Sequence, residues 1–271
     1  MNDNNLKAKK EALISNLTQY DAMLVAFSGG VDSTFLLAMA VRVIGAHVLA
    51  VTAESKVHPQ REREDARRIA ESLGVKHIVI KSSEMNLSDF TANSADRCYV
   101  CKKHVLGEIA EIAEKMGINY MAHGANADDL DDYRPGLKAA EEAGVLAPLV
   151  VAGLRKDDIR QLSREMGLPT WDKPSMACLA SRIPYGTPIS SRALQMVEKA
   201  EDLLLGVGVR TCRVRYHGDI ARIELDPADF PLILAEDVRG KIIDKFRELG
   251  FVYVSLDLDG YMQGSLNKVI S

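Results

Sequence analysis

The sequence predicts an α/β fold in which a doubly wound parallel sheet is followed by a small C-terminal α+β domain. Apolar, strand-like segments alternate with helical periodicity through residues 20–124. The first such segment, "AMLVAF" at 22–27, is apolar throughout, as expected of a strand buried on both faces of a parallel sheet. Near residue 170 the alternation stops, and a stretch rich in Pro, Gly and Ser follows. The alternation predicts the sheet, and the break predicts a second domain.

The larger domain is expected to span residues 1–170. A leading helix is predicted over 5–19, because Leu6, Leu13 and Leu17 lie on one helical stripe. The segments after it alternate as a parallel sheet requires, so ligands are expected beyond the carboxyl ends of the strands. The expected strands are 22–27, 47–53, 76–82 and 118–124, and the expected helices are 33–44, 58–73 and 95–116.

The segment 171–190 has no periodicity, and we expect it to be a hinge or active-site loop. For residues 191–271 we expect a small α+β domain that binds substrate or joins subunits. Its expected elements are a helix at 191–206, strands at 209–217 and 219–226, a helix at 232–249 and a strand at 251–258.

Composition and charge narrow the possible partners. The 271 residues are 47% hydrophobic and 27% charged, with a net charge of −4, whereas nucleic-acid binders usually carry a basic surplus. No apolar run reaches the roughly 18 residues of a membrane span, and the polar N-terminus does not look like a secretory signal. We therefore expect a cytoplasmic protein that does not bind membranes or nucleic acid. Its four cysteines are then core residues, metal ligands or reactive thiols.

A glycine-rich turn, "SGGVDS", follows the first predicted strand and opens a helix. It has neither the lysine of a Walker A loop nor the spacing of a dinucleotide fingerprint. The glycines let the backbone approach an anion, and the first helical N–H groups point toward it. The alternative is a tight turn capped by Ser and Asp. The residues expected to bind a phosphate group here are Ser28, Gly29, Gly30, Val31, Asp32 and Ser33.

The turn resembles the pyrophosphate loop (PP-loop) of the ATP-pyrophosphatase superfamily, whose fold is of the adenine nucleotide alpha-hydrolase type. The resemblance implies cleavage of ATP between its α and β phosphates and a grip of the loop on the β and γ phosphates. Asp32 would hold Mg²⁺ or cap the helix. After the fourth strand, "GANADDLDDYRPG" places Asp128, Asp129, Asp131 and Asp132 at the same sheet edge. They form either a solvated acidic turn or part of a Mg²⁺ site, with Asp128 and Asp129 as the candidate ligands.

Four motifs together resemble the LarE family of sulfur transferases over residues 20–267: "SGGVDS", "DDYRPGLKA", "SRIPYGT" and "DIARIEL". The resemblance implies that ATP adenylates a carboxylate of pyridinium-3,5-biscarboxylic acid mononucleotide. Sulfur then displaces AMP and leaves a thiocarboxylate, a step toward the nickel-pincer nucleotide of lactate racemase. It further implies ATP contacts from Ser55 and Gly124, and a homo-oligomer such as a hexamer.

The source of the sulfur is open. In family members that sacrifice a cysteine, that residue stands six positions after a tryptophan, but here Ala177 follows Trp171 at this spacing and Cys178 comes next. "CYVCKKH" adds Cys98 and Cys101, so three cysteines could hold a 4Fe–4S cluster whose open iron binds hydrosulfide from a donor protein. Zinc with His104 as the fourth ligand, a persulfide or sacrificed sulfur on Cys178, and unligated thiols are the alternatives. Cys178 and Asp32 are thus the candidate catalytic residues.

In "TCRVRYH", strand alternation places Cys212 on an apolar face, where we expect it in the core. The opposite face carries Arg213 and Arg215, with Arg222 and Glu224 on the next strand. This face is either a solvated hairpin surface or a phosphate site. By resemblance, Glu201, Arg213 and Arg215 line a pocket for the substrate phosphate, while Met262 stands where the family has an arginine.

The sequence leaves three other functions as alternatives. A tRNA thiolation enzyme would share the chemistry but usually adds a basic RNA-binding module. An amidotransferase-type synthetase would need an ammonia source, and no segment offers one. A regulatory nucleotide-binding module would have no use for three placed cysteines.

Overall fold

The fold is described from a computed structural model, which covers residues 3–131, 135–174 and 177–262. Contacts divide the chain into two compact units. Unit 1 comprises Met1–Phe90 and Asp96–Met176, and unit 2 comprises Thr91–Ala95 and Ala177–Ser271. The division falls inside the segment 171–190. Among the described residues, no helix is both long and apolar enough to cross a membrane.

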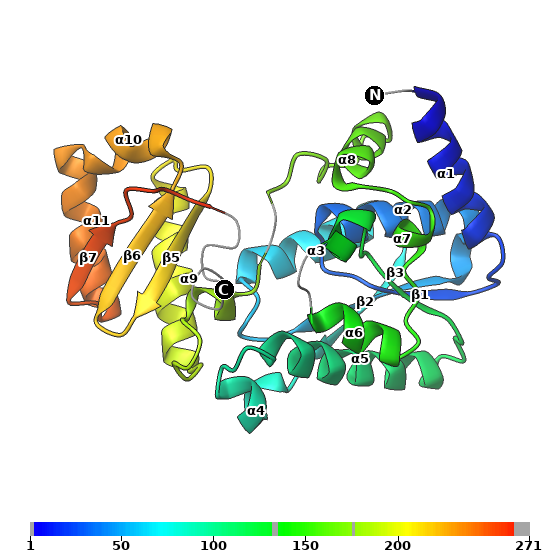
Figure 1. The fold of residues 1–271 in the computed structure, drawn as a ribbon, viewed down its shortest axis with the longest axis horizontal. Coiled ribbons are helices and arrows are strands. Elements are labelled where there is room, and N and C mark those ends of the chain that lie inside the picture. Colours follow the sequence, from blue (N-terminus) through cyan, green and yellow to red (C-terminus); the bar gives the residue numbers. More distant parts are fainter. Residues whose placement is uncertain (1–2, 132–134, 175–176, 263–271) are drawn as a thin grey trace. The chain divides into compact units, whose positions relative to one another are not determined.

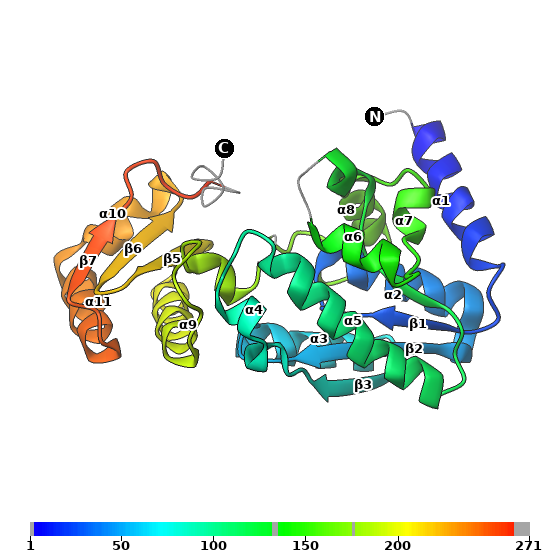
Figure 2. The ribbon, with the colours of Figure 1, turned by 60° about the horizontal axis from the view of Figure 1, so that its bottom comes forward.

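Unit 1 contains a parallel four-stranded sheet in the order β3-β2-β1-β4. In register, Met23 pairs with Val48 and Leu24 with Met121. Figure 2 shows β1, β2 and β3 side by side and pointing in the same direction. The strands are β1 (Met23–Ala26), β2 (Val48–Glu54), β3 (Lys76–Lys81) and β4 (Met121–His123). The predicted doubly wound parallel sheet is confirmed, although β1 and β4 are shorter than expected.

Helices cover both faces of this sheet, which explains why β1 is apolar throughout. Met23 and Val25 pack in a core with α2 and α3, while Leu24 packs in a second core with α5. Figure 1 shows α2 and α5 on opposite sides of the strands. The longer helices are α1 (Asp3–Leu17), α2 (Val31–Ile44), α3 (Gln60–Ser72), α5 (Arg97–Lys115), α6 (Pro135–Glu142) and α8 (Lys156–Glu165). Two short helices are α4 (Ser88–Thr91) and α7 (Pro148–Val151).

The strand order locates the ligand edge of unit 1. The chain runs outward from β1 through β2 to β3, and then returns through α5 to β4 on the other side of β1. The order therefore reverses between β1 and β4, and ligands of such sheets bind at this point, beyond the carboxyl ends. The PP-loop, residues 28–33, follows β1, and the loop that carries Asp128 and Asp129 follows β4. Both segments that are predicted to bind Mg-ATP therefore lie at the switch point.

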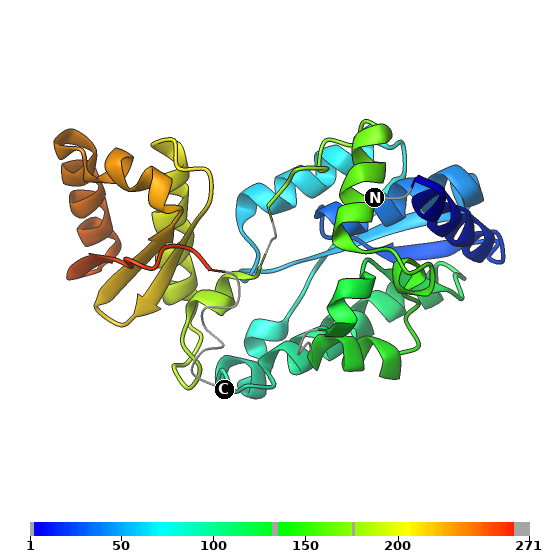
Figure 3. The same cartoon turned by 45° about the horizontal axis from the view of Figure 1, so that its top comes forward.

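Unit 2 is a three-stranded sheet in the order β5-β6-β7. The hairpin β5–β6 is antiparallel, and β7 joins β6 in parallel. One face packs on α9 and α11 (Figure 3), and Cys212 and Phe246 lie in the shared core. The elements are α9 (Ser191–Gly206), β5 (Cys212–His217), β6 (Ile220–Leu225), α10 (Phe230–Leu234), α11 (Glu236–Leu249) and β7 (Tyr253–Leu256). The helix predicted over 232–249 is divided by Ala235, whose backbone is extended at ψ 137°.

One segment of unit 2 comes from the middle of unit 1 in sequence. Asn93 is fully buried, has a left-handed backbone at φ 60°, and follows α4. Its side-chain amide donates hydrogen bonds to the carbonyl oxygens of Pro184 and Thr187, at 2.8 and 2.7 Å. Asn93 thereby fixes the course of the "SRIPYGT" segment. No local pattern in the sequence predicted this contact.

Candidate functional site

The PP-loop forms a compact turn that requires its first glycine. Gly29 has φ +72°, and a Cβ there would lie 2.9 Å from the Cα of Ala66 on α3, so a larger residue is excluded. Gly30 is the N-cap of α2, which begins at Val31, two residues before the predicted start. The hydroxyl oxygens of Ser28 and Ser33 lie 3.0 Å apart, within hydrogen-bond distance. The first turn of α2 therefore begins beside two hydroxyls, an arrangement that suits an anion.

The end of β4 contacts this turn directly. A Cβ on Gly124 would lie 2.7 Å from the backbone nitrogen of Ser33 and 2.9 Å from its Cα. Backbone atoms in a packed helix cannot move away cheaply. The glycine that the resemblance assigned to ATP binding is therefore also needed for β4 to approach the loop.

The loop after β4 carries Asp128 and Asp129, and residues of unit 1 donate hydrogen bonds to both carboxylates. Both oxygens of Asp128 accept hydrogen bonds, one from Arg155 Nη1 at 2.8 Å and one from Lys156 N at 2.7 Å. Asp129 is 6% exposed, and its carboxylate accepts a hydrogen bond from Asn126 N at 3.0 Å. Asp132 lies outside the described residues. Carboxylate oxygens suit Mg²⁺, but both oxygens of Asp128 are engaged at the start of α8. Asp32 is also engaged, through Oδ2, by the ammonium of Lys156.

A polar cluster that residue spacing did not predict lies beyond β2 and β3. The Ser55 hydroxyl donates to Glu84 Oε1, which is fully buried, and accepts a hydrogen bond from Val57 N at 3.2 Å. Burial lowers the pKa of His58, although Glu84 acts in the opposite direction. Burial also lowers the pKa of Lys102 on α5, while the neighbouring Cys101 raises it. A lysine next to a Cys-x-x-Cys pair was the signal available in "CYVCKKH".

His123 at the end of β4 gives this edge a pH-dependent stability. Burial, followed by the charge of Lys102, lowers the pKa of His123 from 6.5 to about 4. Below pH 6.5 the unfolded chain gains a proton that folded His123 does not accept. The contribution of His123 to the free energy of unfolding is therefore complete above 6.5, its pKa in the unfolded chain. It falls by about 3 kcal/mol as the pH drops to about 4, its pKa in the folded protein. Urea unfolding between about pH 7.5 and 4 should show a smaller loss in His123→Gln.

The control for this measurement is His47→Gln, which changes an exposed histidine outside the cluster. It should retain the full acid-induced loss seen in the unaltered protein. An identical loss in His123→Gln would mean that other groups, not His123, cause the acid sensitivity.

The three candidate cysteines lie at or beside the starts of helices. Cys98 and Cys101 are in the first two turns of α5, at the i, i+3 spacing that places them on one side, and the positive end of a helix favours thiolates. Cys178 precedes the short 3₁₀ helix Leu179–Arg182 in unit 2 and is half-buried. The four cysteines form no disulfide. Within the described ranges, no three His, Cys, Asp or Glu side chains are grouped to hold a metal ion.

His104, the proposed fourth zinc ligand, has other partners. Its Nε2 lies 2.9 Å from Ser83 Oγ and 3.1 Å from Glu108 Oε1. The thiolate donor set suits an iron–sulfur cluster, whereas a histidine bound to Ser83 and Glu108 gives less support to zinc.

The face of the β5–β6 hairpin that carries Arg213 and Arg215 is buried. It is therefore not the solvated surface that was one of the two expectations. Arg213 and Arg215 are 9% and 5% exposed, and Glu224 is fully buried. Arg215 donates to Glu224 Oε2 at 2.7 Å and to the carbonyl oxygen of Ser181 at 2.8 Å. Arg213 stacks 5.0 Å from the ring centre of Tyr261, and burial lowers its pKa. Cys212 is 2% exposed in the core on the other face, as predicted.

Glu201 holds the backbone around Cys178 through Arg182. Arg182 Nε and Nη2 donate to the two oxygens of Glu201 at 2.8 and 3.0 Å, and both side chains are almost completely buried. Arg182 Nη1 donates to the Cys178 carbonyl oxygen at 3.0 Å. In the sequence, only its place in the "SRIPYGT" motif singles out Arg182. Any role of Glu201 toward a phosphate is therefore indirect, because its carboxylate is engaged by an arginine.

Glu201→Ala is expected to destabilise unit 2 strongly, since it leaves the Arg182 guanidinium buried without its carboxylate. Breaking a buried pair from one side costs about 3–5 kcal/mol. Urea unfolding measures this loss, with Glu248→Ala as the control, because Glu248 forms an exposed ion pair with Lys245 and such pairs contribute at most about 1 kcal/mol. Equal effects of the two variants would contradict the assigned role of the Arg182–Glu201 pair.

Comparisons with known proteins agree with this architecture. A family model for the queuosine biosynthesis protein QueC matches residues 22–109. A tRNA-specific 2-thiouridylase MnmA from Xanthobacter autotrophicus is 30% identical over 190 residues, covering 56% of this chain and 49% of its own.

Two relatives match along nearly the whole length. An uncharacterized protein from Synechocystis is 41% identical over 266 residues, covering 98% of this chain and 99% of the relative. The pyridinium-3,5-bisthiocarboxylic acid mononucleotide synthase of Lactiplantibacillus plantarum is 37% identical over 267 residues, covering 98% and 96%. Full-length similarity at this level, together with the PP-loop fold and the small second unit, shows the family. The chain belongs to the LarE family of ATP-dependent sulfurtransferases, within the PP-loop superfamily.

Proposed function

We propose that this enzyme converts a carboxylate of pyridinium-3,5-biscarboxylic acid mononucleotide into a thiocarboxylate, toward the nickel-pincer nucleotide of lactate racemase. The observation that carries the proposal is the SGGVDS loop at the switch point, in a chain similar over its full length to a synthase of the bisthiocarboxylic product. A carboxylate resists nucleophiles, whereas an acyl adenylate has a good leaving group. The fold therefore supports activation by ATP before sulfur arrives.

The reaction divides into two balanced steps. A carboxylate oxygen attacks the α-phosphorus of ATP, and pyrophosphate leaves with the electron pair of the broken P–O bond. Sulfide then attacks the acyl carbon, and AMP leaves with the former carboxylate oxygen. Gly29, Gly30 and the Ser28 and Ser33 hydroxyls would bind the β and γ phosphates, with Val31 at the start of the helix. Ser55 and Gly124 would contact ATP, and Asp32 would hold Mg²⁺, with Asp129 as a second carboxylate.

Cys98, Cys101 and Cys178 are the proposed ligands of a 4Fe–4S cluster, which would supply sulfur as hydrosulfide bound to its open iron. The i, i+3 thiols on the first turns of α5 support this ligand set. The second candidate is Cys178 acting alone as a sacrificed donor, favoured by its place directly after Ala177. A sulfide donor protein and a homo-oligomer are also proposed, on the family resemblance.

Arg213 and Arg215 are the proposed site for the substrate phosphate, because closely spaced guanidiniums bind phosphate in a bidentate manner. The test supplies ATP and the biscarboxylic mononucleotide, and measures AMP, pyrophosphate and thiocarboxylate. Arg213→Ala should raise KM for the mononucleotide about tenfold or more and leave ATP affinity nearly unchanged. No thiocarboxylate from the unaltered protein would refute the function, and parallel loss of both ligands in the variant would assign Arg213 to folding.

A further inference from the structure

The PP-loop must hold a highly charged group although it contains no lysine. A Walker A loop places a lysine on the β and γ phosphates, and the SGGVDS motif has none. Backbone N–H groups and a helix dipole contribute only partial charges. Positive side chains from elsewhere in unit 1 would complete the site, and two lysines reach the loop from distant parts of the chain.

The first is Lys173, whose Nζ lies at the start of the loop. It donates to the carbonyl oxygen of Gly29 at 3.2 Å and to Asp65 Oδ2 at 2.9 Å. Its side chain is only 20% exposed. Gly29 is the residue whose left-handed backbone forms the turn, so the ammonium lies directly beside the turn that would hold a phosphate.

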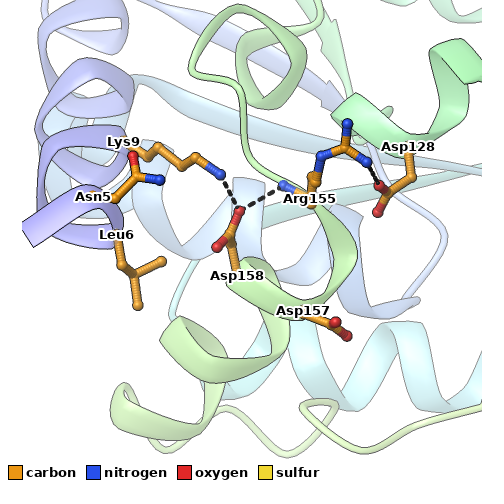
Figure 4. A pocket seen from close by; sticks show the side chains of 7 residues that line it. All are labelled: Asn5, Leu6, Lys9, Asp128, Arg155, Asp157 and Asp158. Carbon is orange, nitrogen blue, oxygen red and sulfur yellow. Dashed lines mark hydrogen bonds and ion pairs between the residues drawn. The ribbon is translucent and has the colours of Figure 1, made fainter. Parts of the chain in front are cut away.

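The second is Lys156, whose Nζ pairs with Asp32 Oδ2 at the other end of the loop. Lys156 is the first residue of α8, and its backbone N–H is bound to Asp128. Asp158, in the same helical turn, accepts hydrogen bonds from Arg155 N at 3.0 Å and from Lys9 of α1 at 2.6 Å. Figure 4 shows Asp128 and Asp158 holding the residues at the start of this helix. The position of Lys156 is therefore fixed from two sides.

Helix α8 positions both lysines. Arg160, one turn after Lys156, donates from Nη1 to the carbonyl oxygen of Trp171 and from Nη2 to that of Lys173, each at 2.8 Å. The same helix thus presents Lys156 directly and fixes the backbone that carries Lys173. Two ion pairs serving stability alone would contribute little and would not need a shared support.

We propose that Lys156 and Lys173 bind the pyrophosphate portion of ATP and stabilise it as the leaving group. When the α-phosphorus is attacked, the bond to the bridging oxygen breaks and its electron pair goes to pyrophosphate. The two ammoniums neutralise the charge gained there. The inference rests on the ATP-dependent chemistry of the proposed function, but not on the identity of the sulfur donor or of the mononucleotide.

Calorimetric titration with ATP, AMP and pyrophosphate in the presence of Mg²⁺ tests this inference. Lys156→Gln and Lys173→Gln should each weaken ATP and pyrophosphate binding about tenfold and leave AMP within about twofold. Lys173→Arg should retain most of the affinity, because it keeps the charge. The control is Lys115→Gln, which removes an exposed pair with Glu111 on α5 and should change none of the three affinities.

Unchanged ATP affinity in both glutamine variants, or an equal loss for ATP and AMP, would overturn the inference. If the variants do not fold, amine acylation of the unaltered protein decides. Pyrophosphate should protect Lys156 and Lys173, and AMP should not, whereas equal labelling with and without pyrophosphate would refute the assignment. Normal ATP binding without thiocarboxylate formation would refute the proposed function and leave this inference standing.

Discussion

Cys98→Ala and Cys101→Ala are each expected to lower thiocarboxylate formation by more than about 100-fold, because loss of a proposed cluster ligand should exceed the 10–100-fold cost of changing an outer-shell partner. In the proposed function adenylation uses the PP-loop and not these thiols, so ATP-dependent pyrophosphate release should persist. The two activities are measured on the same anaerobically prepared protein, together with its visible absorption. The absorption should be lost with the sulfur transfer.

Cys212→Ala is the matched control for this expectation. Cys212 is 2% exposed in the core of unit 2, and its thiol lies 3.8 Å from the Glu201 carbonyl oxygen. Its replacement should cost some stability and leave both absorption and sulfur transfer in place. Full sulfur transfer by Cys98→Ala would remove that thiol from the mechanism.

Gly124→Ala is expected to lower kcat/KM for ATP about 100-fold. The added methyl group would lie 2.7 Å from Ser33 N, so β4 and the start of α2 must separate, and a displacement of about 1 Å can cost this much. Initial rates of pyrophosphate release at varied ATP give the value. Gly107→Ala is the control, since a Cβ at that position of α5 meets nothing within 4 Å. Equal rates for the two variants would contradict the role of the close contact.

The parts of the fold that were predicted from sequence are those with local periodicity. The apolar run of β1 indicated a strand covered on both faces, and the cores with α2 and α5 confirm it. The alternation around Cys212 likewise located the apolar face of unit 2. Both features depend on residues close together in the chain, where side-chain spacing reports burial directly.

The contacts that were missed join residues far apart in sequence. α6, α7 and α8 were not assigned, and with α8 the pairing of Lys156 with Asp32 was missed. Asn93 gave no sign of its bonds to residues 183–187. The buried Arg182–Glu201 pair has no periodic signature either. Such positions depend on tertiary packing, which residue type and spacing do not encode.

Catalytic rather than sacrificial sulfur transfer is the central claim, and intact-protein mass spectrometry tests it most directly. Anaerobically reconstituted enzyme is given ATP, sulfide and the biscarboxylic mononucleotide until product exceeds enzyme several-fold. The cluster-based account predicts that the mass of the polypeptide is unchanged, with Cys178 intact. Product limited to one thiocarboxylate per chain, with loss of H₂S from a cysteine of that chain, would contradict it.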